Sequence, residues 1–92
     1  MTTCAAVLAN ELGLHARAAA RFVRAAAQFE SQIRVGRDPK MADGKSIMGL
    51  LLLAASRGTT LTITADGPDE AAAIATLTRL VESGLSEESC NT

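Results

Sequence analysis

The chain has a single histidine, His15, within the segment Gly13-Leu14-His15-Ala16-Arg17, where a glycine-bearing turn leads into an alanine-rich run. The first turn of a helix has backbone N–H groups without intrahelical partners and lies at the positive end of the macrodipole, so it attracts anions such as phosphate. An imidazole nitrogen is a nucleophile, and Arg17 adds a fixed positive charge two residues on. The segment predicts a phosphorylatable histidine. A capping or surface histidine is the alternative interpretation.

Arginines recur along the run that follows this histidine. Arg17, Arg21 and Arg24 are spaced four and three residues apart among alanines and other apolar residues, which predicts an amphipathic helix over 16–28 with a narrow basic stripe. Because the stripe begins beside His15, it is suited to steer an acidic partner protein onto the histidine. For Arg21 and Arg24 the alternative is the polar outer face that any surface helix needs.

A second segment joins a polar turn to the longest apolar run, 47–55. Ser46 precedes that run and is expected to be the N-cap of a short helix. A phosphate on Ser46 would suit the helix dipole while adding negative charge beside an apolar surface, so it would weaken partner binding without unfolding the domain. Nine apolar residues exceed what one buried face needs, so part of the run, including Ile47, Met48 and Leu51, is expected to be exposed for docking, although core packing is the commoner role of such residues.

Composition and motifs exclude several classes of function. The net charge of −1 and the scarcity of aromatic residues argue against nucleic-acid binding. Cys4 and Cys90 lie at opposite ends of the chain without metal or redox spacing, so neither a metal nor another cofactor is expected. Gly44-Lys45-Ser46 is no phosphate-binding loop, because that motif needs glycine where Pro39 stands. With no membrane-spanning run and no secretory signal, a cytoplasmic protein without membrane insertion is expected.

Patterning along the chain predicts its elements. Strands are expected near 4–9, 32–37, 40–42 and 60–65, and helices over 16–28, from Ser46 onward, and from Pro68 to Gly84, with Pro68 in the first turn of the last helix. The order β-α-β-β-α-β-α predicts an α+β fold, a small antiparallel sheet with helices on one face. One domain is expected over 1–85, followed by a flexible tail at 86–92.

Three segments together resemble a known family. Gly13-Leu14-His15-Ala16-Arg17, Gly44-Lys45-Ser46-Ile47-Met48-Gly49-Leu50, and Gly58-Thr59 before an alternating strand are similar to HPr, the histidine-containing phosphocarrier of the bacterial phosphoenolpyruvate-dependent phosphotransferase system. The resemblance runs from about residue 3 to 84. It implies an open-faced β-sandwich with a four-stranded antiparallel sheet and three helices, and a phosphoryl carrier rather than an enzyme.

The resemblance also implies partners and residue roles. His15 would accept a phosphoryl group on Nδ1 from phosphorylated enzyme I and pass it to a histidine of an enzyme IIA domain, with Arg17 helping to hold the group. Ser46 matches the site used by HPr kinase/phosphorylase in bacteria that have this enzyme, and transcriptional regulators are further candidate partners of an expected monomer. The implied docking residues are Ala16, Ala20, Arg21, Arg24, Ile47, Met48 and Leu51.

The sequence departs from the family at one position. Family members usually have proline directly after the active-site arginine, whereas this chain has Ala18. Proline would preset the first helical turn, and alanine instead leaves a backbone donor and more freedom there. This departure keeps an alternative function open, a mainly regulatory HPr-like protein of a nitrogen-related branch that acts by phosphorylation-dependent binding.

Overall fold

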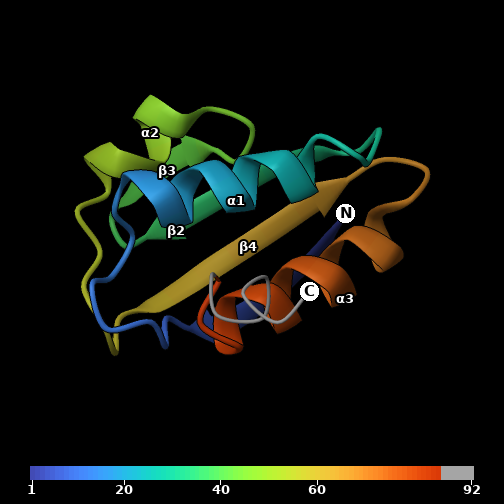
Figure 1. The fold of residues 1–92 in the computed structure, drawn as a ribbon. Helices are drawn as coiled ribbons and strands as arrows, with labels where there is room; N and C mark the ends of the chain where they lie inside the picture. The colour runs from blue at the N-terminus through green and yellow to red at the C-terminus, as the bar shows by residue number, and fades with distance from the viewer. Residues whose placement is uncertain (86–92) are drawn as a thin grey trace.

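The computed structural model describes residues 1–85, so the tail expected at 86–92 lies outside the described residues. The elements follow the predicted order: β1 (Thr2–Val7), α1 (Ala16–Ala26), β2 (Gln32–Arg37), β3 (Lys40–Asp43), α2 (Ile47–Leu52), β4 (Thr60–Asp66) and α3 (Glu70–Glu82) (Figure 1). The boundaries differ from the prediction by a few residues. β1 starts and ends earlier than expected, and α2 ends before Ala54, whose φ of 52° is incompatible with a continuing helix.

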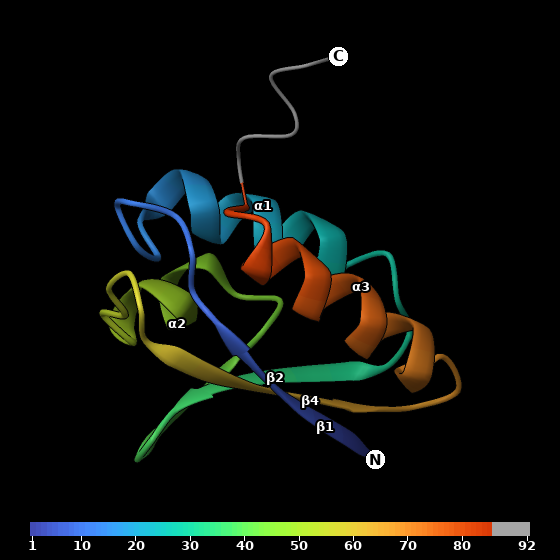
Figure 2. The same cartoon turned by 90° about the horizontal axis from the view of Figure 1, so that it is seen from below.

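The four strands form one antiparallel sheet in the order β1-β4-β2-β3. The centre of the sheet pairs Ile63 of β4 with Cys4 on one side and Val35 on the other. Along β4, Leu61 and Ile63 are buried while Thr60 and Thr62 are exposed, which is the period-two alternation that predicted this strand. All three helices lie on one side of the sheet (Figure 2). The predicted open-faced β-sandwich is therefore confirmed.

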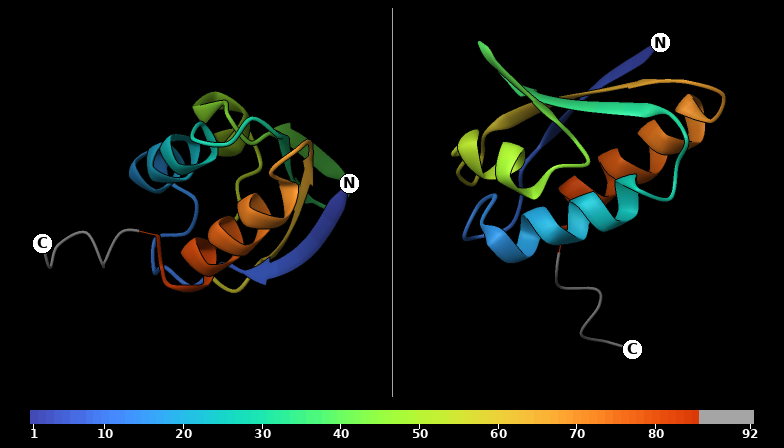
Figure 3. Two further views of the ribbon diagram at one scale, coloured as in Figure 1. Left: turned by 90° about the vertical axis from the view of Figure 1, so that its right-hand side faces the viewer. Right: turned by 90° about the horizontal axis from the view of Figure 1, so that it is seen from above.

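The core lies between the helices and the covered face of the sheet. Each helix contributes a fully buried large side chain, Phe22 from α1, Leu50 from α2 and Leu77 from α3. Helix α1 also buries Ala18 and other alanines completely, and such small side chains let a helix backbone approach its neighbours closely. Two further views show α1 and α3 running beside each other over the sheet (Figure 3). Close packing along its alanine face thus fixes the direction of α1, at whose start His15 lies.

The start of α3 corrects one prediction. The helix begins at Glu70, so Pro68 lies before it rather than in its first turn, and Asp69 is an N-cap without a side-chain capping bond. The Asp69 carboxylate instead accepts hydrogen bonds from the backbone N–H groups of Glu30 (2.9 Å) and Ser31 (3.0 Å) and from the Ser31 hydroxyl. Buried Ser31 needs this partner, and its hydroxyl lowers the pKa of Asp69. The Asp69 carboxylate therefore binds a distant segment of the chain instead of capping its own helix.

Glu70 ties the chain's N-terminus to α3. Its carboxylate accepts hydrogen bonds from the Thr2 hydroxyl (2.6 Å) and the Gly67 N–H (3.1 Å), and it lies 2.9 Å from the N-terminal amine. The Thr2 hydroxyl, followed by the N-terminal amine and the Gly67 N–H, lowers the pKa of Glu70 from 4.5 to about 2. Donors that favour the charged carboxylate are the cause of this shift.

The Glu70→Gln variant is expected to lose less unfolding free energy than the wild type as the pH falls. Because the folded pKa of Glu70 is depressed, its ionisation stabilises the fold above pH 4.5, and this contribution is lost as the pH falls toward about 2. Urea unfolding of wild type and variant between those pH values should show a shallower decline for the variant. Glu82→Gln removes the same charge from an exposed position; an equal flattening by that control would contradict the assignment.

Candidate functional site

His15 is the N-cap of α1 and lies at the positive end of the helix. Its backbone is extended, with φ −88° and ψ −177°, and its Nδ1 accepts a hydrogen bond from the backbone N–H of Arg17 at 3.2 Å. A nitrogen that accepts this bond does so with its lone pair, so Nδ1 is the ring nitrogen placed as the acceptor at the helix start. The side chain is partly exposed. The predicted placement at a helix start is therefore observed, and the ring also has the capping role that was the alternative interpretation of this histidine.

The loop before His15 is held in place by its own backbone. Gly13 has a φ of +72°, and the N–H of Leu14 donates to the carbonyl of Ala55 at 2.9 Å. Buried Asn10 donates from Nδ2 to the carbonyl of Gly13. Sequence reasoning missed the role of Asn10, although Asn is a frequent loop-stabilising residue. These bonds fix the segment from 10 to 14 against the loop that follows α2, and so they fix the position from which His15 projects.

The arrangement around Nδ1 suits the handling of an anion. The N–H of Arg17 lies next to the nitrogen lone pair, and the exposed Arg17 side chain and the exposed Ala16 leave the helix start open to solvent. A group of several negative oxygens placed at Nδ1 would meet a backbone donor, the helix dipole and a guanidinium. A partly exposed nucleophile with such groups beside it is what a phosphoryl acceptor needs.

The other residues singled out from the sequence lie on two neighbouring helices. On α1, Arg24 is exposed while Ala20 and Arg21 are partly exposed. Helix α2 lies beside the N-terminal end of α1 (Figures 1 and 2) and contacts it. On α2, 42% of Ile47 and 66% of Met48 is exposed. The structure therefore brings basic and apolar candidates together beside His15.

Three leucines refine the predicted apolar patch. Leu51, predicted to face partners, is partly buried and packs against the core. Leu52 on α2 and Leu12 in the loop before His15 are the more exposed side chains, at 68% and 77%, and sequence reasoning missed both. The helical period could have identified Leu52 from the sequence, because Leu52 lies four residues after Met48 and therefore on the same face of the helix.

Ser46 caps α2, as predicted. Its Oγ accepts a hydrogen bond from the N–H of Gly49 at 3.1 Å, and its own N–H donates to the carbonyl of Asp43. The neighbouring Lys45 does not face this cap, because its Nζ donates to the carbonyl of Phe29 at 2.7 Å. The partly exposed Ser46 hydroxyl thus lies at the start of the helix that carries Ile47 and Met48.

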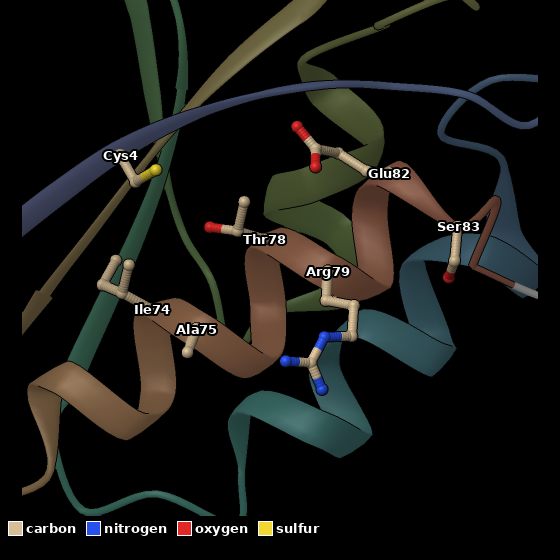
Figure 4. A pocket seen from close by; sticks show the side chains of 7 residues that line it. All are labelled: Cys4, Ile74, Ala75, Thr78, Arg79, Glu82 and Ser83. Atoms are coloured by element: carbon tan, nitrogen blue, oxygen red, sulfur yellow. The ribbon is translucent and has the colours of Figure 1, made fainter.

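A separate groove of about 480 Å³ runs between β1 and α3. Figure 4 shows its lining, which includes Cys4, Thr78 and Glu82, and none of the residues predicted for the site is among them. Within residues 1–85 no group of three or more His, Cys, Asp or Glu residues is placed to hold a metal ion. None of the described helices is long and apolar enough to span a membrane.

Known proteins resemble this chain over most of its length. The family model described as "PTS HPr component phosphorylation site" matches residues 2–83. The phosphocarrier protein HPr of Neisseria meningitidis is 46% identical over 78 residues, which cover 85% of this chain and 88% of that protein. The crystal structure of HPr from Thermoanaerobacter tengcongensis has a TM-score of 0.89 at 44% identity, covering 95% of this chain and 98% of that one.

A regulatory relative is also similar. Crh, the catabolite repression protein of Bacillus subtilis, has a TM-score of 0.75 at 42% identity over 84% of this chain and 88% of its own, in a crystal structure described as a swapped dimer. This chain is thus similar in sequence and fold both to a phosphocarrier protein and to a catabolite repression protein.

Proposed function

This chain belongs to the HPr family of phosphocarrier proteins of the phosphotransferase system, and we propose that its Nδ1 of His15 accepts a phosphoryl group from phosphorylated enzyme I and passes it to a histidine of an enzyme IIA domain. The observation that carries this proposal is the position of Nδ1 at the start of α1, beside the N–H of Arg17. Family members are phosphoryl carriers, and the described residues offer the nucleophile and the anion-binding groups that carriage requires.

The transfer needs few groups from this chain. The Nδ1 lone pair attacks phosphorus as the bond between phosphorus and the donor breaks, and the electron pair of that bond leaves with the donor. The Arg17 N–H that now donates to Nδ1 then donates to a phosphoryl oxygen, and the Arg17 guanidinium balances the remaining charge. In the second transfer, a histidine nitrogen of the enzyme IIA domain attacks phosphorus, the bond between phosphorus and Nδ1 breaks, and its electron pair returns to Nδ1. Orientation by the helix start is the main contribution of the protein.

The docking surface that we propose combines the two helices. Arg21 and Arg24 offer positive charge to an acidic partner, while Ala16 and Ala20 leave room for its backbone to approach α1. Ile47, Met48 and Leu51 supply apolar area on α2, and the exposed Leu52 extends it. An apolar centre with a basic rim is typical of a surface that several acidic partners share. Partners of this class include enzyme I, enzyme IIA domains and HPr kinase/phosphorylase.

Intact mass spectrometry after incubation with phosphoenolpyruvate and enzyme I tests the proposal. The expected product carries one phosphoryl group, which acid removes, because a phosphoramidate bond hydrolyses in acid whereas a phosphoserine ester persists. Addition of an enzyme IIA domain is expected to discharge the carrier and to label the acceptor. An unmodified wild-type chain in the presence of active enzyme I would contradict the proposal.

A regulatory function is the second candidate, and the similarity to Crh favours it. In that case the chain would bind a kinase or a transcription factor according to its phosphorylation state, as a regulatory protein of a nitrogen-related branch of the phosphotransferase system. Phosphorylation at His15 without discharge to any enzyme IIA domain would support this candidate. We also propose that this chain is a monomer, although the Crh structure is a dimer. Sedimentation equilibrium measures the oligomeric state.

Ser46→Asp is expected to weaken partner binding without destabilising the fold. Aspartate can replace serine as the acceptor for the Gly49 N–H, so the unfolding free energy should change by less than about 0.5 kcal/mol. Its charge lies beside the apolar part of the docking surface and should raise the dissociation constant for enzyme I about tenfold. Calorimetric titration and urea unfolding measure the two quantities.

Ser46→Ala is the matched control. It removes the cap and is expected to cost about 1 kcal/mol of stability while leaving the affinity for enzyme I unchanged. A reversed pattern, in which the alanine variant binds weakly and the aspartate variant binds normally, would contradict a regulatory role for charge at this position.

A further inference from the structure

Strand β1 lies at one edge of the sheet (Figure 3), and half of its backbone groups face outward. Just after β1, the N–H of Leu8 donates to the carbonyl of Thr59, the residue opposite it in register, at 2.9 Å. Because such bonds alternate along an antiparallel pair, every second residue of β1 before Leu8 also turns its N–H and C=O groups toward β4. The N–H and C=O groups of Thr3, Ala5 and Val7 therefore point away from the sheet.

The two edge strands of the sheet differ in their protection. An edge strand is a template for a further strand, and proteins commonly protect it by short length, proline or charged side chains. The edge strand β3 has four residues, carries Lys40 and Asp43, and follows Pro39. The edge strand β1 has six residues, Thr2–Val7, without a charged residue or proline. Strand β1 is therefore the edge that is suited to accept another strand.

The groove of about 480 Å³ between β1 and α3 lies beside this edge, and we refer to it as the β1–α3 groove. Its lining includes Cys4, Ile74 and Ala75, so apolar side chains of an added strand would fit there. The Thr78 hydroxyl oxygen, which Figure 4 shows on the Cys4 side of α3, is buried and has no hydrogen-bond partner among residues 1–85. A buried hydroxyl without a partner is uncommon, and an occupant of the groove would account for it.

The charge that faces β1 from α3 is negative. Figure 4 shows the Glu82 carboxylate projecting on the β1 side of α3, whereas Arg79 projects toward α1. Glu82 is exposed, and within residues 1–85 it takes part in no salt bridge. Because β1 and α3 run in the same direction (Figure 2) from the bond between Thr2 and Glu70, Glu82 lies beside the C-terminal end of β1. A basic side chain of an added strand would complement it there.

We propose that the outer edge of β1 and the β1–α3 groove together bind an extended segment of a partner protein, which adds a strand antiparallel to β1. Hydrogen bonds to the backbone of Thr3, Ala5 and Val7 give affinity, and alternate side chains in the groove give specificity. The segment that fits is apolar at every second position and has a lysine or arginine at its N-terminal end, which lies beside Glu82 in the antiparallel orientation. The residues of the proposed docking surface on α1 and α2 do not line this groove, so the proposal does not depend on the proposed function.

Titration of the full chain with the peptide Lys-Thr-Leu-Thr-Ile-Thr-Ala tests the site. The peptide places lysine before the sequence of residues 60–65 of β4, the antiparallel partner of β1 within the sheet, so its leucine and isoleucine can enter the groove while its lysine approaches Glu82. Hydrogen exchange measured by NMR is expected to slow at the amides of Thr3, Ala5 and Val7 and to stay unchanged at Met41 on the other edge. Unchanged exchange at those three amides with millimolar peptide would overturn the proposal.

Proline variants test the role of the edge. Ala5→Pro removes an outward N–H and no bond to β4, and proline is tolerated at such positions of edge strands, so the chain should fold but no longer bind the peptide. Met41→Pro makes the matched change on β3 and should leave binding intact. Peptide binding by the Ala5→Pro variant with wild-type affinity would overturn the proposal.

A charge variant and a dilution series complete the test. Glu82→Gln should weaken peptide binding about two- to fivefold, as expected for an exposed ion pair, and should have no effect on a peptide with glutamine in place of lysine. If dilution of the chain without peptide shifts the amide signals of Thr3, Ala5 and Val7, the edge instead pairs with a second copy, which would overturn a partner segment as the occupant.

Discussion

The His15→Ala variant is expected to take up no phosphoryl group from phosphoenolpyruvate and enzyme I. The chain has no second histidine, and within residues 1–85 no other nucleophile accepts a backbone N–H at the start of α1 as Nδ1 does. Loss of the covalent acceptor leaves binding but no reaction, so the effect on transfer is complete rather than fractional. Intact mass spectrometry and radiolabel transfer to an enzyme IIA domain measure it.

This substitution also removes a helix cap. Because His15 Nδ1 satisfies the N–H of Arg17, alanine is expected to cost about 0.5–2 kcal/mol of unfolding free energy. His15→Asn is the matched variant, since its side-chain oxygen can accept the same N–H without being a nucleophile. It should retain wild-type stability and still fail to be phosphorylated. Phosphorylation of the asparagine variant would contradict the assignment of His15.

Gly13→Ala is expected to have the second largest effect, because two costs coincide at this residue. The φ of Gly13 is +72°, a region that disfavours L side chains, and an added Cβ would lie 2.6 Å from the carbonyl oxygen of Ala55 and 2.9 Å from Cα of Ser56. That carbonyl accepts the N–H of Leu14, so the clash must displace the bond that anchors the loop before His15. A loss of about 2–4 kcal/mol in unfolding free energy is expected, with slower phosphorylation.

Gly58→Ala provides the control for backbone strain alone. Gly58 has a φ of +89°, yet nothing lies within 4 Å of its added Cβ. This variant should lose only the cost of the left-handed conformation, about 1–2 kcal/mol, and should be phosphorylated at the wild-type rate. Equal losses in the two variants, measured by urea unfolding, would show that the contact with Ala55 contributes nothing.

Local patterns predicted much of this fold and the location of the candidate site. The alternation from Thr60 to Ala65, the arginine spacing of α1 and the Ser46 cap depend on residues within one or two turns of each other, so the sequence is sufficient to find them. The position of His15 at a helix start belongs to the same class of local signal.

Contacts between distant segments required the tertiary structure. Asp69 and Glu70 lie at the start of α3, where an acidic residue is favourable. In the structure, however, Asp69 accepts hydrogen bonds from Ser31, 38 residues away, and Glu70 accepts one from Thr2, 68 residues away. The bond from Leu14 to Ala55 and the partial burial of Leu51 likewise depend on how α2 packs on the core.

The sequence by itself determined the order of elements and the placement of the candidate nucleophile beside an arginine, because short-range periodicity and residue chemistry set these features. Only the tertiary structure decided the strand order β1-β4-β2-β3 and the distant partners of Asp69 and Glu70 at the start of α3. The physical reason is that buried polar groups and helix faces take whatever partner close packing brings to them, and no local pattern encodes that partner.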